Sequence, residues 1–545
     1  MSTESVGAAP LTQGTAGGAF ARQATGLVRQ AGAFDVFVYN TNFINIAIGV
    51  AFIFLFVPAG AYPGANIYLA IVFTVVAVLP TNLVYGMMAS IMPRSGGDYV
   101  YVSRTLGPLW GLAANWNYTV WSFFYIGVPA AFLGRFGISS LMRTVGVSSG
   151  NLGLVNVGTF FASPVGTFLA GLVLIVVFTA IFITGLNTYM RVQNVLFVVA
   201  MLSLVAIVVI AVGASVGDYT ARFNAYFAGV TGHRDTAKAI MDSLGRNAPA
   251  AAAFDLHDTV ASMTWAFSVL GFGLASAYIG GEVKGASRAQ LKGMVGSVLF
   301  SALWMLLLVA VVLRVIPYNL IGAIDAASPT QTGLGFTPVF TELVGVLTSN
   351  WFLLLLIGVG FCLWTYAWLP IYIITTTRNM LAWAFDGLLP VRVSAVDERF
   401  HSPVVAILLS SGLGIVFLGV YSFNTSFATI SGFFGQVWTY MLAGIAAIVL
   451  PYRLRDVFEA SPVRWRVGGV PLLSILGVLS LLGMGVIEYA YLNDPNSGIS
   501  FRAPTMILVN VAVLLSGFVF YALTRIVRAR QGIDVGLAFA EIPPE

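Results

Sequence analysis

The chain has 545 residues, of which 58% are hydrophobic and only 9% are charged. Soluble domains carry about 25% charged residues, so this composition excludes the several soluble domains that the length alone would suggest. The net charge of +5 is spread over loops, which argues against a nucleic-acid partner. A single cysteine, Cys362, excludes an internal disulfide and a cysteine-based metal site.

The first 34 residues are rich in Gly, Ala, Ser and Thr and contain Arg22 and Arg29. They lack the apolar core that a secretory signal needs near the N-terminus. We therefore predict a disordered cytoplasmic tail over residues 1–34.

Twelve apolar stretches follow, each about as long as the 20 residues that a helix needs to cross a bilayer. They are too long for barrel strands of about ten residues. The sequence therefore predicts an all-α membrane protein with twelve transmembrane helices at about 36–58, 66–91, 108–134, 160–183, 193–213, 260–282, 291–315, 349–377, 404–421, 428–450, 468–492 and 504–526.

The distribution of Lys and Arg predicts the orientation. With the N-terminus inside, 18 of the 26 basic residues lie on the cytoplasmic side, as positive charges in short loops do. Half of the other eight lie in one long connection, residues 214–259. We expect a multi-pass protein of the cytoplasmic membrane with both termini cytoplasmic.

Two of the twelve stretches are interrupted. The first contains Asn40, Thr41, Asn42, Asn45 and Gly49, and the sixth contains Gly271, Gly273, Gly280 and Gly281. Glycine weakens a helix interior by about 1 kcal/mol relative to alanine, although clustered glycines also occur at close helix contacts in membranes. The two stretches occupy matching places in two halves of five helices, a pattern typical of a transporter's binding site.

The segment from Met92 to Asn117 is a charged interruption between two long apolar runs. Arg94, Asp98 and Arg104 stand beside Tyr99 and Tyr101, which suits an amphipathic segment at the membrane surface. An ordinary basic cytoplasmic loop has the same composition.

Four stretches resemble the amino acid–polyamine–organocation permeases. PRSGGDYVYVSRTLGP at Pro93–Pro108 is similar to that superfamily's junction between the second and third helices. The others are Gly185–Leu202, Gly280–Gly293 and Thr377–Leu409, which resemble the entry to the fifth helix, the end of the sixth, and the run from the eighth to the ninth.

The resemblance implies a leucine-transporter-type fold, a five-plus-five inverted repeat with two extra C-terminal helices. The expected parts are a first repeat at 35–213, a long extracellular loop at 214–259, a second repeat at 260–450, helices 11 and 12 at 451–530 and a cytoplasmic tail at 531–545.

The same resemblance places a substrate between helices 1, 3, 6, 8 and 10. Unwinding helix 1 at Ile48, Gly49, Val50 and Ala51 would free N–H groups for a carboxylate. Carbonyl groups released in helix 6 at Leu270, Gly271 and Gly273 would accept from an ammonium group. No protein charge is then buried at the membrane centre, where a charge costs about 2.5–3.5 kcal/mol on insertion scales.

The resemblance also implies side-chain contacts and a gate. Trp121, Ser122 and Tyr125 of helix 3 would face the site, and Phe267 would cover the bound substrate. Glu282 with Lys284 or Arg288, near Arg94 or Arg104, would form a cytoplasmic gate of ion pairs. Solvated loop charges explain the same pattern.

The sequence departs from the superfamily pattern at several positions. Only Gly49 remains of a glycine-rich signature in helix 1; Leu274, Ala286 and Ala200 replace an acidic residue, a proline and a lysine found in other members. Spans 1, 3, 5, 6, 8 and 10 contain no buried Asp, Glu, His or Lys as a proton carrier. Coupling to Na⁺, with Thr365 as a possible sodium ligand, coupling to H⁺, or uncoupled exchange stay open, and no cofactor is expected.

These features predict a secondary active transporter that moves amino acids or related amines by alternating access. Its partners would be that small-molecule substrate and the lipid bilayer, with no nucleic acid and an open oligomeric state. The alternatives are a membrane-embedded enzyme, for which no HExxH motif, paired buried carboxylates or other catalytic residues are found, and a channel, for which no filter-like segment is found. No ATP-binding GxxxxGK[ST] loop is present.

Overall fold

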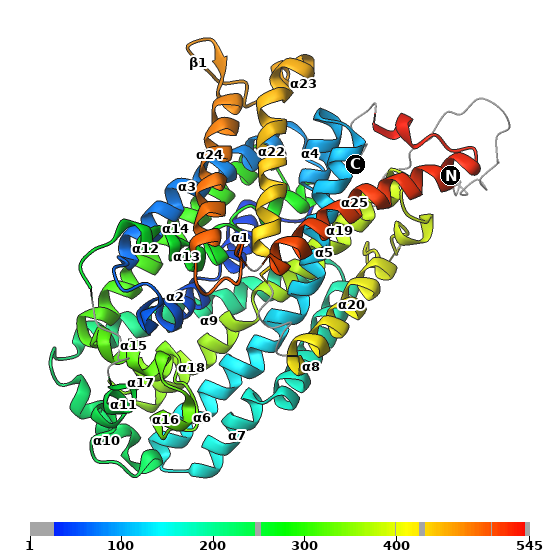
Figure 1. Cartoon of the computed structure of the whole chain (residues 1–545). Helices are drawn as coiled ribbons and strands as arrows, with labels where there is room; N and C mark the ends of the chain where they lie inside the picture. The colour runs from blue at the N-terminus through cyan, green and yellow to red at the C-terminus, as the bar shows by residue number, and fades with distance from the viewer. Residues whose placement is uncertain (1–26, 246–251, 398, 425–430, 503, 540–545) are drawn as a thin grey trace, which may run out of the picture.

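The computed structural model describes residues 27–245, 252–397, 399–424, 431–502 and 504–539. In these ranges the protein is almost entirely helical (Figure 1). Two short strands, β1 (Arg466–Val467) and β2 (Val470–Pro471), form an antiparallel hairpin in which Arg466 pairs with Pro471.

Eleven helical segments of the described chain are long and apolar enough to cross a membrane. They confirm the predicted all-α membrane fold. The segments are α1–α2–η1 (Ala33–Ile44, Ile46–Phe56, Val57–Ala61), α3 (Ile67–Ile91), α5–η2–α6 (Pro108–Phe132, Leu133–Ile138, Ser139–Ser149), α8 (Pro164–Ile183), α9 (Leu186–Gly213), α14 (Ala286–Val315), α18–α19 (Trp351–Thr365, Trp368–Phe385), α20 (Val404–Phe423), α22 (Phe433–Arg453), α24 (Leu472–Asn493) and α25 (Thr505–Arg530).

The predicted sixth span, 260–282, is not a continuous helix. It consists of the short helices α12 (Leu256–Ala261) and α13 (Met263–Leu270), a turn, and the 3-10 helices η4 (Ala275–Tyr278) and η5 (Gly280–Glu282). The sequence therefore predicted twelve spans, whereas the described chain has eleven continuous ones, and the difference is this sixth span. Below, helix 1 means α1–α2, helix 6 means α13 to η5, and helix 8 means α18–α19.

Shorter elements lie at the two ends of the bundle (Figure 1). The end that we call the α4 face carries α4 (Asp98–Thr105), η6 (Val391–Val393), α23 (Arg455–Glu459), the β-hairpin and η7 (Val535–Phe539). The opposite end, which we call the vestibule face, carries α7 (Leu152–Ala162), α10 (Tyr219–Thr231), α11 (Thr236–Leu244), α15 (Tyr318–Ala326), α16 (Pro329–Thr332) and α17 (Phe340–Gly345).

Three connecting segments are more ordered than the sequence suggested. All residues of α4 are buried, and α4 packs on α5 and α22, so the predicted amphipathic surface segment is wrong. Burial is tolerated because Arg104 of α4 pairs with Asp386. The connection 214–259 contains α10 and α11, with α11 packed on α15 and α16. In the C-terminal tail, Val535 and Ala538 are buried.

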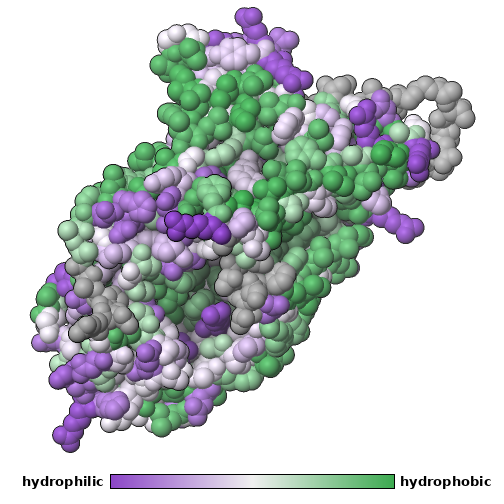
Figure 2. Space-filling view, in the orientation of Figure 1, coloured by the Kyte–Doolittle hydropathy of each residue, from purple (hydrophilic) through white to green (hydrophobic). Residues whose placement is uncertain are grey.

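Large apolar side chains cover the outside of the bundle. Figure 2 shows them along α8, α20 and α25, where Val173, Val416 and Leu508 are about 60% exposed. Soluble proteins rarely expose such continuous apolar surfaces. This belt therefore marks the lipid-facing side of the helices.

Candidate functional site

Helix 1 breaks at Asn45. This residue has φ 60° and ψ 73°, and it is at once the C-cap of α1 and the N-cap of α2. Its N–H donates to Thr41 O at 2.9 Å, and its side-chain oxygen accepts from the Ile48 N–H at 3.4 Å. Asparagine adopts this left-handed conformation more readily than other non-glycine residues because its short polar side chain bonds locally.

The break lies one turn earlier than predicted. Ile48, Gly49, Val50 and Ala51 are all within the helix α2, so the predicted unwinding at these residues is wrong. The sequence analysis relied on Gly49, whereas the signal was the capping residue Asn45. Because the first N–H groups of a helix have no intrahelical partner, those of Ile46 and Ala47 at the start of α2 are the groups available to an anion.

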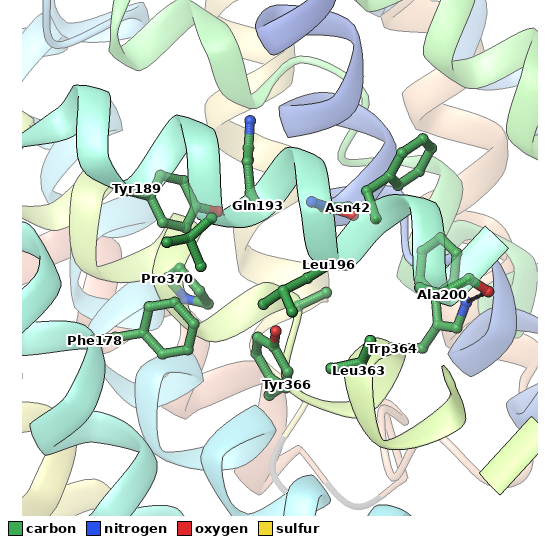
Figure 3. Close-up of a pocket in the computed structure, with 13 residues that line it drawn as sticks. Asn42, Phe178, Tyr189, Gln193, Leu196, Ala200, Leu363, Trp364, Tyr366 and Pro370 are labelled. Atoms are coloured by element: carbon green, nitrogen blue, oxygen red, sulfur yellow. Dashed lines mark hydrogen bonds between the residues drawn. The ribbon is translucent and has the colours of Figure 1, made fainter. Parts of the chain in front are cut away.

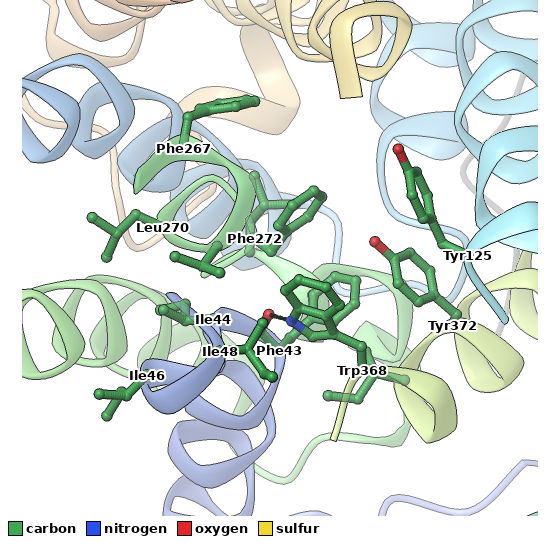
Figure 4. Close-up of a cluster of buried hydrophobic side chains, with 14 of the residues drawn as sticks. Phe43, Ile44, Ile46, Ile48, Tyr125, Phe267, Leu270, Phe272, Trp368 and Tyr372 are labelled. Atoms are coloured by element: carbon green, nitrogen blue, oxygen red, sulfur yellow. Dashed lines mark hydrogen bonds between the residues drawn. The ribbon is translucent and has the colours of Figure 1, made fainter. Parts of the chain in front are cut away.

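Two reciprocal hydrogen bonds connect the break in helix 1 to a break in helix 8, where α18 ends at Thr365 and α19 begins at Trp368. Asn45 Nδ2 donates to Trp364 O at 2.7 Å. Trp368 Nε1 donates to Phe43 O at 2.6 Å (Figure 4). The ring of Trp364 is held in turn by Ala200 of α9, whose carbonyl accepts from Trp364 Nε1 at 3.1 Å (Figure 3).

Helix 6 leaves the helical conformation after Leu270, where the glycines predicted it. Asn40 of helix 1 holds the unwound part, because its side chain accepts from the Ser276 N–H at 2.9 Å and donates to Ser276 Oγ at 3.0 Å. Within the described chain, the carbonyl groups of Leu270, Gly271 and Gly273 accept no hydrogen bond. These carbonyl groups are therefore free to accept from a ligand.

A cavity of about 1000 Å³ opens on the vestibule face and ends above the helix breaks. We call it the vestibule. Its inner end is lined by aromatic side chains, namely Phe52, Tyr125, Trp265, Trp368 and Phe433.

Rings from helices 1, 6 and 8 pack against two of the vestibule rings, Tyr125 and Phe433. The ring centroid of Phe272 lies 5.1 Å from that of Phe43 and 5.2 Å from that of Phe433. Tyr372 stacks on Tyr125 at 5.6 Å. Figure 4 shows these side chains converging from α1, the unwound part of helix 6, α5 and α19. A small apolar solute in the vestibule would thus contact aromatic faces.

The walls of the vestibule carry buried carboxyl groups. Asp494 accepts a hydrogen bond from Thr264 Oγ1 at 2.6 Å and another from the Tyr62 hydroxyl, which itself accepts from Trp265 Nε1 at 2.8 Å. Burial raises the pKa of Asp494 above its usual range, and it raises the pKa of Asp325 well above that range. Arg135 lines the same cavity, so both signs of charge are available there.

The α4 face is closed by buried ion pairs. Arg378 donates to both carboxylate oxygens of Glu282, at 2.7 and 2.9 Å, and Arg104 does so to Asp386, at 2.8 and 2.9 Å. The N-terminal segment adds backbone hydrogen bonds, because the N–H of Ala31 donates to Glu282 O at 3.0 Å.

The ion pairs that close the α4 face differ from those of the predicted gate. Glu282 pairs with Arg378, whereas Lys284 and Arg288 are exposed. The sequence analysis did not include Arg378 in the predicted gate. Nothing in the local sequence around Glu282 indicates a partner 96 positions away.

Of the residues predicted to contact substrate, Tyr125 lines the vestibule, and its hydroxyl accepts from the Gly432 N–H at 2.9 Å. Ile48 and Ala51 line a smaller side cavity beside it. Trp121 lies against Gly435 of α22 and against Gly432, the N-cap of that helix, and the Ser122 hydroxyl donates to Tyr118 O within its own helix.

Phe267 and Gly49 are not part of the vestibule lining. Phe267 is buried against Tyr491 and Gly271, and Gly49 faces Val269 and Met305. The residue spacing typical of the superfamily did not predict Trp265. This residue lies two positions before Phe267, on a different side of α13. It also missed Trp368 and Phe52, which no polar or glycine signal marks.

Thr365 stays a predicted sodium ligand. Its hydroxyl donates to Cys362 O at 2.7 Å and lies beside Gly137, and the neighbouring Trp364 carbonyl already accepts the Asn45 amide. Hard cations need several oxygen ligands around one point. Two oxygen atoms are fewer than such a site needs, so we derive no step through Na⁺.

A sequence profile described as amino acid permease matches residues 34–515, most of the chain. The chain belongs to the amino acid permease family. The predicted superfamily is thus confirmed, and the protein is a transporter rather than an enzyme.

Individual relatives of this permease are distant. It is 24% identical to uncharacterized transporters of Mycobacterium tuberculosis and Mycobacterium bovis over 473 residues, covering 85% of this chain and 91% of theirs. It is 25% identical over 477 residues to the branched-chain amino acid permease BcaP of Bacillus subtilis, covering 84% of this chain and 87% of that protein. The permease therefore shares nearly the whole membrane body of these relatives.

Proposed function

We propose that this permease carries neutral, apolar amino acids across the membrane by alternating access. One observation carries the proposal: the broken helices 1 and 6 meet beyond the inner end of a cavity that is open to one face, while ion pairs close the other face. A carrier needs a central site with access from one side at a time. In this conformation, access is from the vestibule face.

The proposed site holds both ends of an amino acid by main-chain groups. The N–H groups of Ile46 and Ala47 would receive the carboxylate, because the start of a helix favours negative charge. The carbonyl groups of Leu270 and Gly271 would accept from the ammonium group. The rings of Phe43, Phe272 and Trp368 lie where the side chain would go, and they move apart as the substrate enters.

Two further observations support an apolar amino acid as the substrate and an outward-facing vestibule. The aromatic lining suits an apolar side chain, and the relative BcaP is named for branched-chain amino acids. The sequence analysis counted 18 of the 26 Lys and Arg residues at the termini and in the loops predicted to be cytoplasmic, and the segment of α4 is one of these loops. This distribution supports the α4 face as the cytoplasmic one, and in our proposal the vestibule therefore opens outward and both termini are cytoplasmic.

Transport by the purified protein in liposomes tests the proposal. Radiolabelled leucine should enter with saturable kinetics, and unlabelled leucine inside should accelerate its entry by counterflow. Arginine and putrescine should compete weakly. Non-saturable entry of leucine, or no difference from liposomes without protein, would overturn the proposed function.

A further inference from the structure

A cluster of buried tyrosines surrounds one carboxyl group on the α4 side of the helix breaks. Tyr85 of α3, Tyr118 of α5, Tyr278 of η4 and Tyr440 of α22 are each at most 1% exposed, and Asp98 of α4 is fully buried. Tyr118 stacks on Tyr278 with centroids 5.0 Å apart, and its ring lies 6.0 Å from that of Tyr440. Five separate elements therefore direct polar side chains to one place.

Packing alone does not explain this cluster. Within the described chain, the hydroxyl groups of the four tyrosines and Oδ1 of Asp98 make no hydrogen bond of full geometry, although the Tyr278 hydroxyl approaches Asp98 and the Tyr118 and Tyr440 hydroxyl groups approach each other. Buried polar groups are nearly always paired with protein, water or a ligand. Polar groups that lie close together without full hydrogen bonds can exchange partners, so the cluster suits the passage of a small polar species such as a proton.

Asp98 lies in an environment without charge compensation. Asn115 Nδ2 donates to its Oδ2 at 3.4 Å, and the Tyr278 hydroxyl faces it. Among the described residues, the groups on α3, α5 and η4 that face Asp98 are Tyr85, Tyr118, Tyr278 and this amide, all uncharged, and Tyr440 of α22 reaches Asp98 only through Tyr118 and Tyr85. Two nearby arginines form ion pairs with other carboxylates: Arg104 pairs with Asp386, and Arg378 pairs with Glu282. Burial raises the pKa of Asp98 to about 7.

A polar route connects Asp98 with the vestibule. Gln436 lies one turn before Tyr440 on α22 and three positions after Phe433, whose ring lines the vestibule. Neither polar atom of the Gln436 side chain has a partner within the described chain. Residues three or four apart share one side of a helix. Polar groups thus run from the vestibule past Gln436, Tyr440 and Tyr118 to Asp98.

We propose that Asp98 binds the proton that couples amino acid transport to the proton gradient, with Gln436 and the tyrosine cluster as its route to the vestibule. The inference rests on the proposed function. The Asp98 carboxylate takes up one proton from the vestibule side and becomes neutral, and it releases that proton when the α4 face opens. Rings 5 to 6 Å apart leave no room for an amino acid between them, so the cluster fits a proton and not the substrate.

The sequence analysis found no proton carrier because it searched six membrane spans, and Asp98 lies in the segment between two spans. It read Asp98 as a surface charge. Only the burial of α4 shows that this carboxyl group is inside the protein.

The test compares gradient-driven uptake with counterflow in liposomes. With acid outside, the wild type should accumulate leucine above the external concentration, and leucine should drive protons inward, as reported by a pH dye in the lumen. Asp98→Asn should lose at least nine-tenths of this accumulation and of the proton influx, but it should retain counterflow, which needs no net proton movement. Asp456→Asn, which makes the same change at an exposed site on the same face, should behave as the wild type.

The outcomes separate the two proposals. Accumulation by Asp98→Asn equal to that of the wild type would overturn the inference, as would wild-type counterflow without proton influx. Absence of wild-type counterflow would instead overturn the proposed function. If Asp98→Asn fails to fold, the inference is tested instead by proton influx into wild-type liposomes and by the variant Gln436→Leu. Gln436→Leu should slow proton influx several-fold more than counterflow, and an equal change in both rates would contradict the route.

Discussion

The side-chain amide of Asn45 donates a hydrogen bond to the main-chain carbonyl of Trp364, 319 positions later in the chain. The bond joins the interruption of helix 1 to the interruption of helix 8. Because Trp368 Nε1 returns a bond to Phe43 O, the two breaks hold each other in one relative position. The start of α2, where we place the substrate carboxylate, depends on this joint.

Replacing Asn45 separates its two roles. Asn45→Ala should lower the free energy of unfolding by about 1–2 kcal/mol for the left-handed backbone and by about 1–3 kcal/mol for the unpaired buried carbonyl of Trp364. Asn45→Gly avoids the first cost and keeps the second. Thermal melting should rank the wild type above Asn45→Gly and Asn45→Gly above Asn45→Ala. Equal melting of the two variants would mean that the backbone conformation contributes nothing.

Gly49 tests the contact between helices 1 and 6. A Cβ atom there would lie 2.7 Å from Val269 Cγ2 and 3.0 Å from Met305 Cε, so Gly49→Ala should destabilise the protein by about 1–3 kcal/mol through overpacking. Val269→Ala should restore much of the loss in the double variant. The larger side chain of Gly49→Leu should lower stability further for the same reason. Additive effects of the two alanine substitutions would contradict the contact.

The ion pair between Arg378 and Glu282 should be essential for stability. Glu282→Gln leaves the Arg378 guanidinium buried without its countercharge, which costs about 3–5 kcal/mol. The control is Glu459→Gln, which removes the exposed partner of Arg466 on the same face and should cost at most about 1 kcal/mol. Denaturation of the two variants in detergent measures the difference. A loss for Glu282→Gln as small as for the control would show that this pair does not close the α4 face.

Stability should depend on pH through Asp98. The folded chain holds the Asp98 proton up to about pH 7, whereas the ordinary aspartate pKa is 3.8. Since the folded state binds this proton more tightly, its stability falls as pH rises from about 4 to about 7 and is constant above that range. Asp98→Asn removes this contribution, so its melting temperature should fall less between pH 4 and pH 8 than that of the wild type. Parallel pH profiles would show that Asp98 is charged in the folded protein.

The fold could be predicted from the sequence because a bilayer allows few solutions. Stretches such as 66–91 and 193–213 are apolar over the length of a span, and only a helix pairs its own backbone groups in lipid. The break in helix 6 was also predictable, since Gly271 and Gly273 weaken a helix strongly. These features depend on local composition.

The details of the site could not be predicted because they depend on contacts between distant residues. The break in helix 1 followed the capping side chain of Asn45 and not Gly49. The partner of Glu282 is set by how helix 8 packs, and the burial of Asp98 is set by how α4 packs on α5 and α22. Residue spacing carries no information on which face of α13 meets the cavity, so Trp265 was missed in favour of Phe267.

The most direct test of the central claim is a structure of the purified permease with bound leucine. The account predicts density for leucine between the N–H groups of Ile46 and Ala47 and the carbonyl groups of Leu270 and Gly271, with its side chain against Phe272 and Trp368. Leucine bound elsewhere, or helices 1 and 6 running unbroken through the membrane, would contradict it.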